Sequence, residues 1–340
     1  MTRVVTFGEI MLRLAPPGYQ RFFQSPEFEA TFGGGEANVS VSLSLFGIPA
    51  AFVTKLPKNA VGDAAVGELR RYGVDTNKIV RGGNRVGIYY CEKGASQRAS
   101  KVLYDRAHSS IAEANAPDFD WDEIFIGVEW FHFTGITPAL GDSVAEICLA
   151  ACKKAKEKGV KVSCDLNYRK NLWSTEKAGK VMAGLMQYVD LLIANEEDSE
   201  KVFGITADNT DVTSGHISHD GYKGVAKKLT DKFGFKQVAI TLRSSRSASD
   251  NGWAGMLYEN GEAFFSREYD VHIVDRVGGG DSFGAGLIYS LLNGTAGSEA
   301  INFAVAASCL KHSIEGDFNL VTVDEVKALA GGDASGRVQR

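Results

Sequence analysis

Short strand-like runs alternate with helix-like runs along most of this 340-residue chain, and this alternation restricts its fold more than any other feature. The strand-like runs are apolar and β-branched, as in RVVTFG (residues 3–8) and VKVSCDLN (residues 160–167). The helix-like runs carry apolar residues at helical spacing, and several of them end at a glycine. Parallel strands need helical crossovers, so the pattern predicts an α/β fold with a doubly wound, mainly parallel sheet flanked by helices.

Two segments interrupt the alternation. Residues 9–35 and about 82–110 are rich in aromatic residues and β-formers and show no helical spacing. We expect them to add strands that project from the main sheet as a small β-sheet lid. Because no long linker or internal repeat separates the segments, we expect residues 1–330 to form a single domain. The small and polar residues 331–340 are expected to be a frayed tail.

Composition excludes some classes of partner. The chain has 37 Lys and Arg against 42 Asp and Glu, a net charge of -5, which opposes binding to a nucleic-acid backbone. The first residues enter a strand pattern without a signal-peptide core, and no apolar run approaches the ~20 residues that span a bilayer. Five cysteines without metal spacing are typical of reduced thiols. We therefore expect a cytoplasmic protein without nucleic-acid or membrane partners.

Polar residues follow several of the strand-like runs. In doubly wound sheets, ligands bind beyond the carboxyl ends of the strands, so these residues are expected to share one cleft. They are Asp165, Asn167 and Arg169, then Asn195 to Asp198, then Thr241 and Arg243, and last the aspartate at 281.

The stretch DRVGGGDSFGAG (residues 275–286) places a glycine turn before a helix-like run. Consecutive backbone N–H groups at a helix start make an anion site. Asp281 then has two interpretations, as an N-cap of the helix or as a general base beside a site that stabilises negative charge. The turn is not a phosphate-binding loop of the Gly-Lys-Ser/Thr type.

A second glycine cluster, FGGGEAN (residues 32–38), also precedes a helix-like run. It is either a tight turn with close packing or a place where a small polar ligand lies against bare backbone. In the second case Asn38 would hydrogen-bond that ligand.

These motifs, together with DLNYR and NEED in the middle of the chain, occur in an order that resembles the ribokinase-like carbohydrate kinases of the PfkB family. The resemblance covers about residues 3–325. The usual C-terminal motif of the family is Asp-Thr-x-Gly-Ala-Gly-Asp. Here Arg276 replaces the threonine and Gly279 replaces the alanine, while both aspartates remain.

The resemblance implies roles for residues at matching positions. Asp281 would be the catalytic base, and Gly278, Gly279 and Gly280 would form the anion hole. ATP would contact Thr241 and Arg243, together with Asn195 and the glycines at 278 and 280. Mg²⁺ would be held through water by Asp198, where the family has glutamate. Many relatives also hold K⁺ at the first aspartate of the motif, which is Asp275 here.

Within the family the sequence is most similar to 2-keto-3-deoxygluconate kinases, which carry Gly-x-Tyr and Tyr-x-Arg on the lid. The resemblance assigns the substrate to Gly33, Gly34, Asn38, Tyr89, Tyr104, Arg106, Ile136 and Arg169. The two arginines would bind the carboxylate of an acidic sugar. The alternatives are that Arg106 is a surface lid residue and that Arg169 forms a structural ion pair with Asp165.

These implications together predict an ATP-dependent kinase that phosphorylates the primary hydroxyl of 2-keto-3-deoxygluconate. A fructokinase or another neutral-sugar kinase on the same scaffold is the alternative enzyme. A sugar- or nucleotide-binding regulator without catalysis is the alternative from another class. We expect a homodimer, since lid strands in this family commonly pack against a second subunit.

Overall fold

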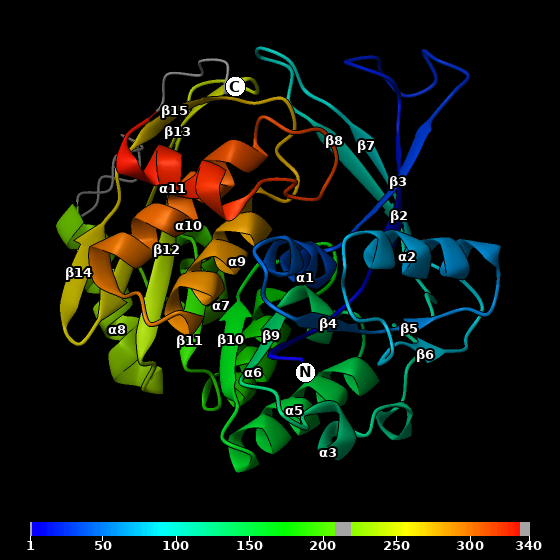
Figure 1. Cartoon of the computed structure of the whole chain (residues 1–340), viewed down its shortest axis with the longest axis horizontal. Coiled ribbons are helices and arrows are strands. Elements are labelled where there is room, and N and C mark those ends of the chain that lie inside the picture. Colours follow the sequence, from blue (N-terminus) through cyan, green and yellow to red (C-terminus); the bar gives the residue numbers. More distant parts are fainter. Residues whose placement is uncertain (1, 208–218, 334–340) are drawn as a thin grey trace.

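The structure is a computed structural model that describes residues 2–207 and 219–333, and a nine-stranded sheet lies at its centre (Figure 1). The strand order is β14-β13-β12-β11-β10-β9-β1-β4, and β15 pairs with β13. The strands are β1 (Val4–Phe7), β4 (Ala50–Val53), β9 (Trp130–Thr134), β10 (Lys161–Asp165), β11 (Leu191–Ala194), β12 (Gln237–Ser245), β13 (Asp250–Glu259), β14 (Glu262–Phe265) and β15 (Tyr269–His272). All neighbours from β4 to β12 run parallel, which confirms the predicted parallel sheet.

Beyond β12 the sheet becomes antiparallel. The hairpin between β13 and β14 turns at Asn260 and Gly261, whose φ angles are 51° and 85°. Two consecutive positive φ values match the turn that Asn-Gly favours between antiparallel strands. Strand β12 pairs with β13 along its whole length, so β12 continues past the end of β11 toward the functional cleft.

Helices cover both faces of the sheet, as the alternation predicts (Figure 1). Helices α3, α5, α6 and α8 pack on one face, and α1, α9 and α10 pack on the other. The helices are α1 (Gly35–Leu45), α2 (Ala60–Arg71), α3 (Trp121–Ile124), α4 (Ile136–Ala139), α5 (Asp142–Glu157), α6 (Thr175–Met186), α7 (Glu196–Phe203), α8 (His219–Phe233), α9 (Gly279–Leu292), α10 (Gly297–Lys311) and α11 (Val323–Gly331), with a 3₁₀ turn at Ala116–Asp118.

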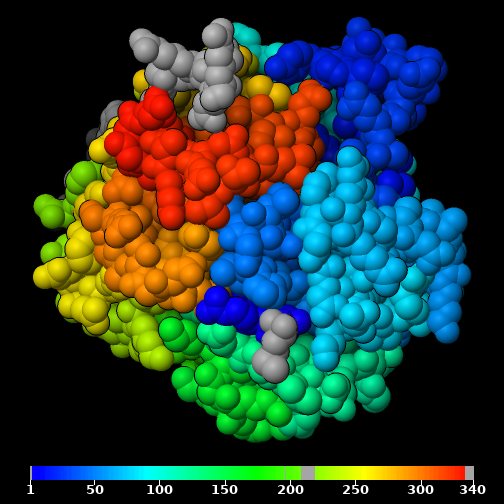
Figure 2. All heavy atoms as spheres, in the orientation of Figure 1, coloured from blue at the N-terminus to red at the C-terminus, as the bar shows by residue number. Residues whose placement is uncertain are grey.

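A separate four-stranded sheet, of order β3-β2-β7-β8, arises from the two segments that interrupt the alternation. Its strands are β2 (Met11–Ala15), β3 (Glu29–Gly33), β7 (Ile88–Glu92) and β8 (Lys101–Asp105), and a two-stranded sheet joins β5 (Lys55–Leu56) to β6 (Val80–Arg81). Part of the small sheet stands away from the main body, at the upper right of Figure 2. The predicted fold class is therefore confirmed, and we call this small sheet the lid.

The single domain over residues 1–330 stays a prediction. The frayed tail falls mostly on residues 334–340, which lie outside the described residues. Within the described part of the chain, each helix is too short or too polar to cross a bilayer.

Candidate active site

A cavity of about 590 Å³ opens where the carboxyl ends of β10, β11 and β12 meet the lid strands β7 and β8. Most of the residues that the sequence predicts for the site line this cavity. They are Gly34, Asn38, Tyr89, Tyr104, Arg106, Ile136, Arg169, Asn195, Asp198, Thr241, Arg243, Gly278, Gly280 and Asp281. Three predicted residues, Gly33, Gly279 and Asp275, lie outside the lining. The volume is in the range of pockets that hold small metabolites.

The glycine turn leaves the N-terminus of α9 open. Gly278 is its N-cap residue, with φ 84° and ψ −5°, and no side chain caps the helix. Asp281 stands inside the first turn, so the interpretation of Asp281 as an N-cap is wrong. The backbone N–H groups of Gly280 and Asp281 have no partner among the described residues. Free N–H groups at a helix start attract an anion, as the sequence predicts.

Asp281 is held in place from helix α1. The Nδ2 atom of Asn38 donates to Oδ2 of Asp281 at 2.6 Å, and Oδ1 of Asn38 accepts from the N–H of Gly34 at 3.2 Å. Burial raises the pKa of Asp281 to about 7. A carboxylate with a pKa near neutrality, next to free anion-binding groups, is suited to take a proton from a hydroxyl.

The turn FGGGEAN contributes backbone to the site. A Cβ atom on Gly34 would lie 1.9 Å from the carbonyl oxygen of Glu9, so only glycine fits this close approach. Gly34 and Gly35 line the cavity, but Gly33 packs against Asp317, whose Oδ2 would lie 2.0 Å from an added Cβ. The structure therefore brings Gly34, and not Gly33, to the cavity where the sequence places both.

Aspartates at the strand ends form the acidic side of the cavity. Asn195 caps α7, and its Nδ2 donates to Oδ2 of Asp198 at 3.0 Å. Burial raises the pKa of Asp198 to about 6. Burial also raises the pKa of Asp165 well above its usual range, and the charges of Asp198 and Asp281 raise it further. Asp165 lines the cavity. The sequence predicts it only as one of several polar residues at strand ends, without a role of its own.

Arg106 is buried, so the interpretation of Arg106 as a surface residue is wrong. Its Nε donates to Oε2 of the buried carboxylate of Glu9 at 2.8 Å. Ser109 also donates to Glu9, at 2.6 Å, and the Arg106 guanidinium lies 5.3 Å from the ring centre of Tyr104. Since Glu9 neutralises Arg106, this arginine is a weaker partner for a substrate carboxylate than the sequence suggests.

Arg169 differs from Arg106 because it forms no close ion pair among the described residues, although its charge lowers the pKa values of Asp165, Asp198 and Asp281. It follows β10 and is exposed, and its one hydrogen bond to the described residues goes to the carbonyl oxygen of Tyr168 at 3.4 Å. The structure shows no close ion pair between Arg169 and Asp165, but the charge of Arg169 lowers the pKa of Asp165, so the two residues interact at longer range. Because no carboxylate is hydrogen-bonded to it, the guanidinium of Arg169 is available to an anionic ligand.

Other predicted substrate residues occupy the lid side of the cavity. The ring centres of Tyr89 and Tyr104 lie 6.1 Å apart. Tyr89 donates its hydroxyl to Asp317 at 2.5 Å and is buried, whereas Tyr104 is 44% exposed. Ile136, at the start of α4, donates its N–H to Thr134 at 3.2 Å. Tyr104 is therefore the tyrosine of this pair whose hydroxyl remains available to a ligand.

The far end of the cavity is lined by alternate residues of β12. Side chains two apart share one face of a strand, which explains why Thr241 and Arg243 both reach the cavity. Burial lowers the pKa of Arg243, and the charge of Arg276 lowers it further. Two neighbouring cations that form no close ion pair among the described residues are suited to phosphate groups. The sequence identifies Arg276 only as a departure from the family motif and does not predict it as a site residue. It also does not predict Trp253, which lines the cavity and pairs with Arg243 across the sheet.

The unusual Gly279 has a packing explanation. A Cβ atom there would lie 2.6 Å from Cε1 of the His312 ring. His312 is fixed in this place because its Nδ1 donates to the carbonyl oxygen of Ser308 at 2.7 Å, and its ring lies 4.8 Å from that of Trp253. Burial lowers the pKa of His312 to about 4, so the ring is neutral. The histidine fills the space that an alanine methyl would need.

We therefore expect Gly279→Ala to destabilise the protein by about 1–3 kcal/mol, the range for an overpacked core. His312→Ala should relieve this clash, so the double variant should lose less than the sum of the two single variants. Urea unfolding of the four proteins of this cycle measures the coupling. Simple additivity would show that His312 is not the reason for the glycine.

Asp275, the predicted potassium ligand, belongs to a buried ionic network behind the glycine turn. Its carboxylate accepts from Arg13 at 2.5 Å and from the N–H of Gly316 at 3.2 Å. The protein therefore already satisfies the group that K⁺ would need.

A sequence model described as pfkB family carbohydrate kinase matches residues 1–319. The chain belongs to the PfkB family of carbohydrate kinases. As a member of this family it is an enzyme that transfers a phosphoryl group to an alcohol group of a sugar.

Several proteins similar to this PfkB kinase carry names of related activities. A crystal structure of 2-dehydro-3-deoxygluconokinase from Thermotoga maritima is 55% identical, has a TM-score of 0.94, and is covered in full by 98% of this chain. The 2-dehydro-3-deoxygalactonokinase of Haloferax volcanii is 33% identical over 97% of this chain and 98% of its own length. The 2-dehydro-3-deoxygluconokinase of Bacillus subtilis is 26% identical over 93% and 91%.

Proposed function

We propose that this kinase uses ATP to phosphorylate the primary hydroxyl of 2-keto-3-deoxygluconate, the sugar acid also called 2-dehydro-3-deoxygluconate. The observation that carries this proposal is Arg169, a cation that lines the same cavity as Asp281 and forms no close ion pair with any described carboxylate. A guanidinium binds a carboxylate through two parallel hydrogen bonds, which a neutral sugar cannot accept in the same way. The likeness to the Thermotoga maritima relative supports the same substrate.

In the proposed reaction Asp281 accepts the proton of the primary hydroxyl. Asn38 orients this carboxylate, and the raised pKa makes it a better proton acceptor than an ordinary aspartate. The N–H groups of Gly280 and Asp281 stabilise the negative charge on the phosphoryl group as it moves. The hydroxyl and the phosphoryl group can meet because base and anion site lie in the same helical turn.

ATP would occupy the end of the cavity that β12 lines. Thr241 and Arg243 contact the nucleotide in this proposal, and Arg276 adds a second cation for its phosphates. Asn195 would lie near the phosphates at the acidic side, because it caps the helix that begins there.

Mg²⁺ would belong beside Asp198. Within the described residues, no three metal-binding side chains come together to enclose an ion. Mg²⁺ usually keeps several waters and binds few carboxylates when it accompanies ATP, so Asp198 and Asp165 fit it through water. When bound, Mg²⁺ would neutralise phosphate charge.

The raised pKa of Asp281 predicts how the reaction depends on pH. The base must be unprotonated, so kcat/KM should fall about tenfold per pH unit below about pH 7 and level off above it. A pH profile in buffers of constant ionic strength measures this limb. A flat profile from about pH 5 to 8 would exclude Asp281 as the titrating group.

The closest chemical competitor is the epimeric sugar acid. The Haloferax volcanii relative is named for 2-dehydro-3-deoxygalactonate, which has the same carboxylate and the same primary hydroxyl. We therefore propose this epimer as a second substrate of the same cavity. Its contact with Arg169 would be the same.

Product analysis tests the proposed reaction. After incubation with the sugar acid, ATP and Mg²⁺, ³¹P and ¹³C spectra should show one phosphate ester on the primary carbon. An ester on a secondary carbon would contradict the placement of the sugar. If no sugar gave a phosphate ester, the result would instead support the alternative of a sugar- or nucleotide-binding regulator without catalysis.

We also propose a homodimer through the lid. Strand β8 is exposed along its length, and Leu103, on the face opposite to the cavity-lining Tyr104, is 46% exposed. An exposed apolar surface of this kind is suited to pack against the lid of a second copy of the chain. Light scattering should give twice the mass of one chain, and a monomer at micromolar concentration would contradict the proposal.

A further inference from the structure

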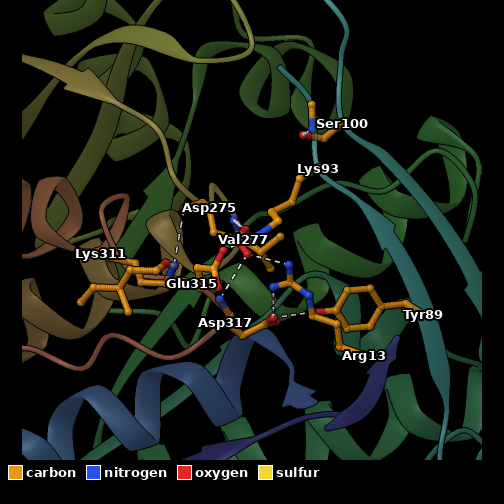
Figure 3. A network of polar contacts seen from close by, with 12 residues as sticks. Arg13, Tyr89, Lys93, Ser100, Asp275, Val277, Lys311, Glu315 and Asp317 are labelled. Carbon is orange, nitrogen blue, oxygen red and sulfur yellow. Dashed lines mark hydrogen bonds and ion pairs between the residues drawn. The ribbon is translucent and has the colours of Figure 1, made fainter. Parts of the chain in front are cut away.

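A buried network of charged residues lies behind the glycine turn (Figure 3). The guanidinium of Arg13, from β2, donates to Oδ2 of Asp275 at 2.5 Å and to Oδ1 of Asp317 at 2.9 Å. The hydroxyl of Tyr89 donates to the same oxygen of Asp317 at 2.5 Å. Arg13 and both aspartates are at most 4% exposed. The network thus ties the lid to the two loops that flank the start of α9.

Lys311, the last residue of α10, supplies a second buried cation. Its side chain is completely buried. Its Nζ donates to the carbonyl oxygen of Ile314 at 3.0 Å, and the carbonyl oxygen of Asp275 lies 3.5 Å away (Figure 3). The ammonium group therefore lies among backbone carbonyl oxygens of both loops. Carbonyl oxygens are also the ligands with which proteins replace the hydration shell of K⁺.

The Lys311 side chain touches the anion site from behind. A Cβ atom on Gly278 would lie 3.1 Å from Cε of Lys311 and 2.0 Å from the carbonyl oxygen of Asp317. This close packing and the φ of 84° both require glycine. A shift of Lys311 would therefore displace the N-cap of α9, and with it the free N–H group of Gly280.

The residues around Asp275 do not fit K⁺. Oδ1 of Asp275 accepts from the N–H of Val277 at 3.1 Å, while Oδ2 accepts from Arg13 and from the N–H of Gly316. In the described network two buried carboxylates face two buried cations, Arg13 and Lys311. A potassium ion beside Asp275 would add a positive charge that neither of these two carboxylates is left to balance.

We propose that Lys311, supported by Arg13, is a built-in cation that holds the glycine turn in its anion-binding form, so that the kinase needs no monovalent metal ion. Lys311 does not line the cavity, so it is a positioning residue that acts through Gly278. The proposal rests on phosphoryl transfer at the proposed site, but it also predicts thermal behaviour that does not depend on any substrate.

The first test uses the unaltered protein. Its ATP turnover is measured with the sugar acid and Mg²⁺ in KCl, NaCl and choline chloride at matched ionic strength, so that screening is equal. The three values should agree within about twofold, and Tm without substrate should be the same in KCl and in choline chloride. Activation by K⁺ of tenfold or more, or a Tm increase specific to K⁺, would overturn the proposal.

The second test removes the cation. Lys311→Met leaves the carbonyl oxygens without a partner, so kcat in choline chloride should fall about tenfold or more while KM for the sugar changes little. K⁺ or NH₄⁺ should then restore kcat in a saturable manner and raise Tm of the variant. Full kcat of Lys311→Met in choline chloride would overturn the proposal.

A neighbouring lysine provides the matched control. Lys93 is also buried, but its Nζ pairs with Oε1 of the exposed Glu315 at 2.6 Å instead of lying among the carbonyl oxygens. Lys93→Met should therefore show no response to K⁺. A response of Lys93→Met equal to that of Lys311→Met would contradict a specific role for Lys311. If no sugar were a substrate, the Tm comparisons would still decide whether K⁺ binds.

Discussion

Asp281→Asn should abolish most turnover and at the same time make the protein more stable. Loss of a general base reduces kcat by roughly 10²–10⁴-fold. Binding of ATP should stay nearly unchanged, because the N–H groups of the helix start remain. Steady-state kinetics with the sugar acid and calorimetry with ATP measure the two effects. Turnover within a few fold of the unaltered protein would show that Asp281 is not the base.

The gain in stability follows from the pKa of Asp281. Burial raises its pKa to about 7 in the folded protein, so the folded state holds the proton more tightly than the unfolded state does. This linkage stabilises the fold below the unfolded pKa of ~4 and is lost as pH rises through about 7. Asparagine removes the unfavourable buried charge. Tm of Asp281→Asn should therefore exceed that of the unaltered protein by a few degrees at about pH 8, and this difference should shrink toward pH 5.

Asp142→Asn is the matched control, because Asp142 also lies in the first turn of a helix. Its side chain is 84% exposed and pairs with Lys177 at 2.7 Å. The control should change stability by no more than about 0.5 kcal/mol and leave turnover unaltered. If Asp142→Asn and Asp281→Asn had equal effects, the effects would come from the position in the first turn of a helix and not from the cavity around Asp281.

Arg169→Ala should raise KM for the sugar acid about 10–100-fold, the range for a lost hydrogen-bonded charge. The effect on fructose as substrate should be small, because fructose has no carboxylate. Arg169 forms no ion pair at hydrogen-bond distance with the described residues, so its removal breaks no direct contact with a carboxylate, although the pKa values of Asp165 and Asp198 should rise. Kinetics with both sugars at saturating ATP measure the difference.

Arg243→Ala tests the opposite end of the cavity. Arg243 is also an arginine that lines the cavity, but it lies on β12 beside Arg276. Its removal should raise KM for ATP and leave KM for the sugar acid unchanged. If Arg169→Ala affected the sugar acid and fructose equally, Arg169 would not be the carboxylate partner.

Local patterns in the sequence predict the fold and most of the cavity. Alternating strands and helices place residues such as Asn195 and Thr241 at the same edge of one sheet, because parallel strands end together. The glycine turn likewise predicts the open start of α9. The glycines and the first residues of α9 are neighbours in the chain, so their spacing in the sequence is enough to predict this local structure.

The rest depends on contacts between distant segments. Glu9 pairs with Arg106, and Arg13 with Asp317, across separations that no spacing rule describes. Lys311 resembles any basic residue at the end of a helix until the loop after it folds back over Asp275. Because of these long-range pairs, Arg106 is neutralised by Glu9, and Asp275 accepts from Arg13 where the sequence predicts a potassium ligand.

The most direct test of the central claim compares two substrates with the unaltered protein. kcat/KM is measured with ATP and Mg²⁺ for 2-keto-3-deoxygluconate and for fructose under the same conditions. If Arg169 recognises the carboxylate, kcat/KM should be about 10²-fold or more higher for the sugar acid than for fructose. The sugar acid makes a charged contact with Arg169 in addition to the hydroxyl contacts that both sugars can make. Equal values, or a preference for fructose, would contradict the assignment and support a neutral-sugar kinase.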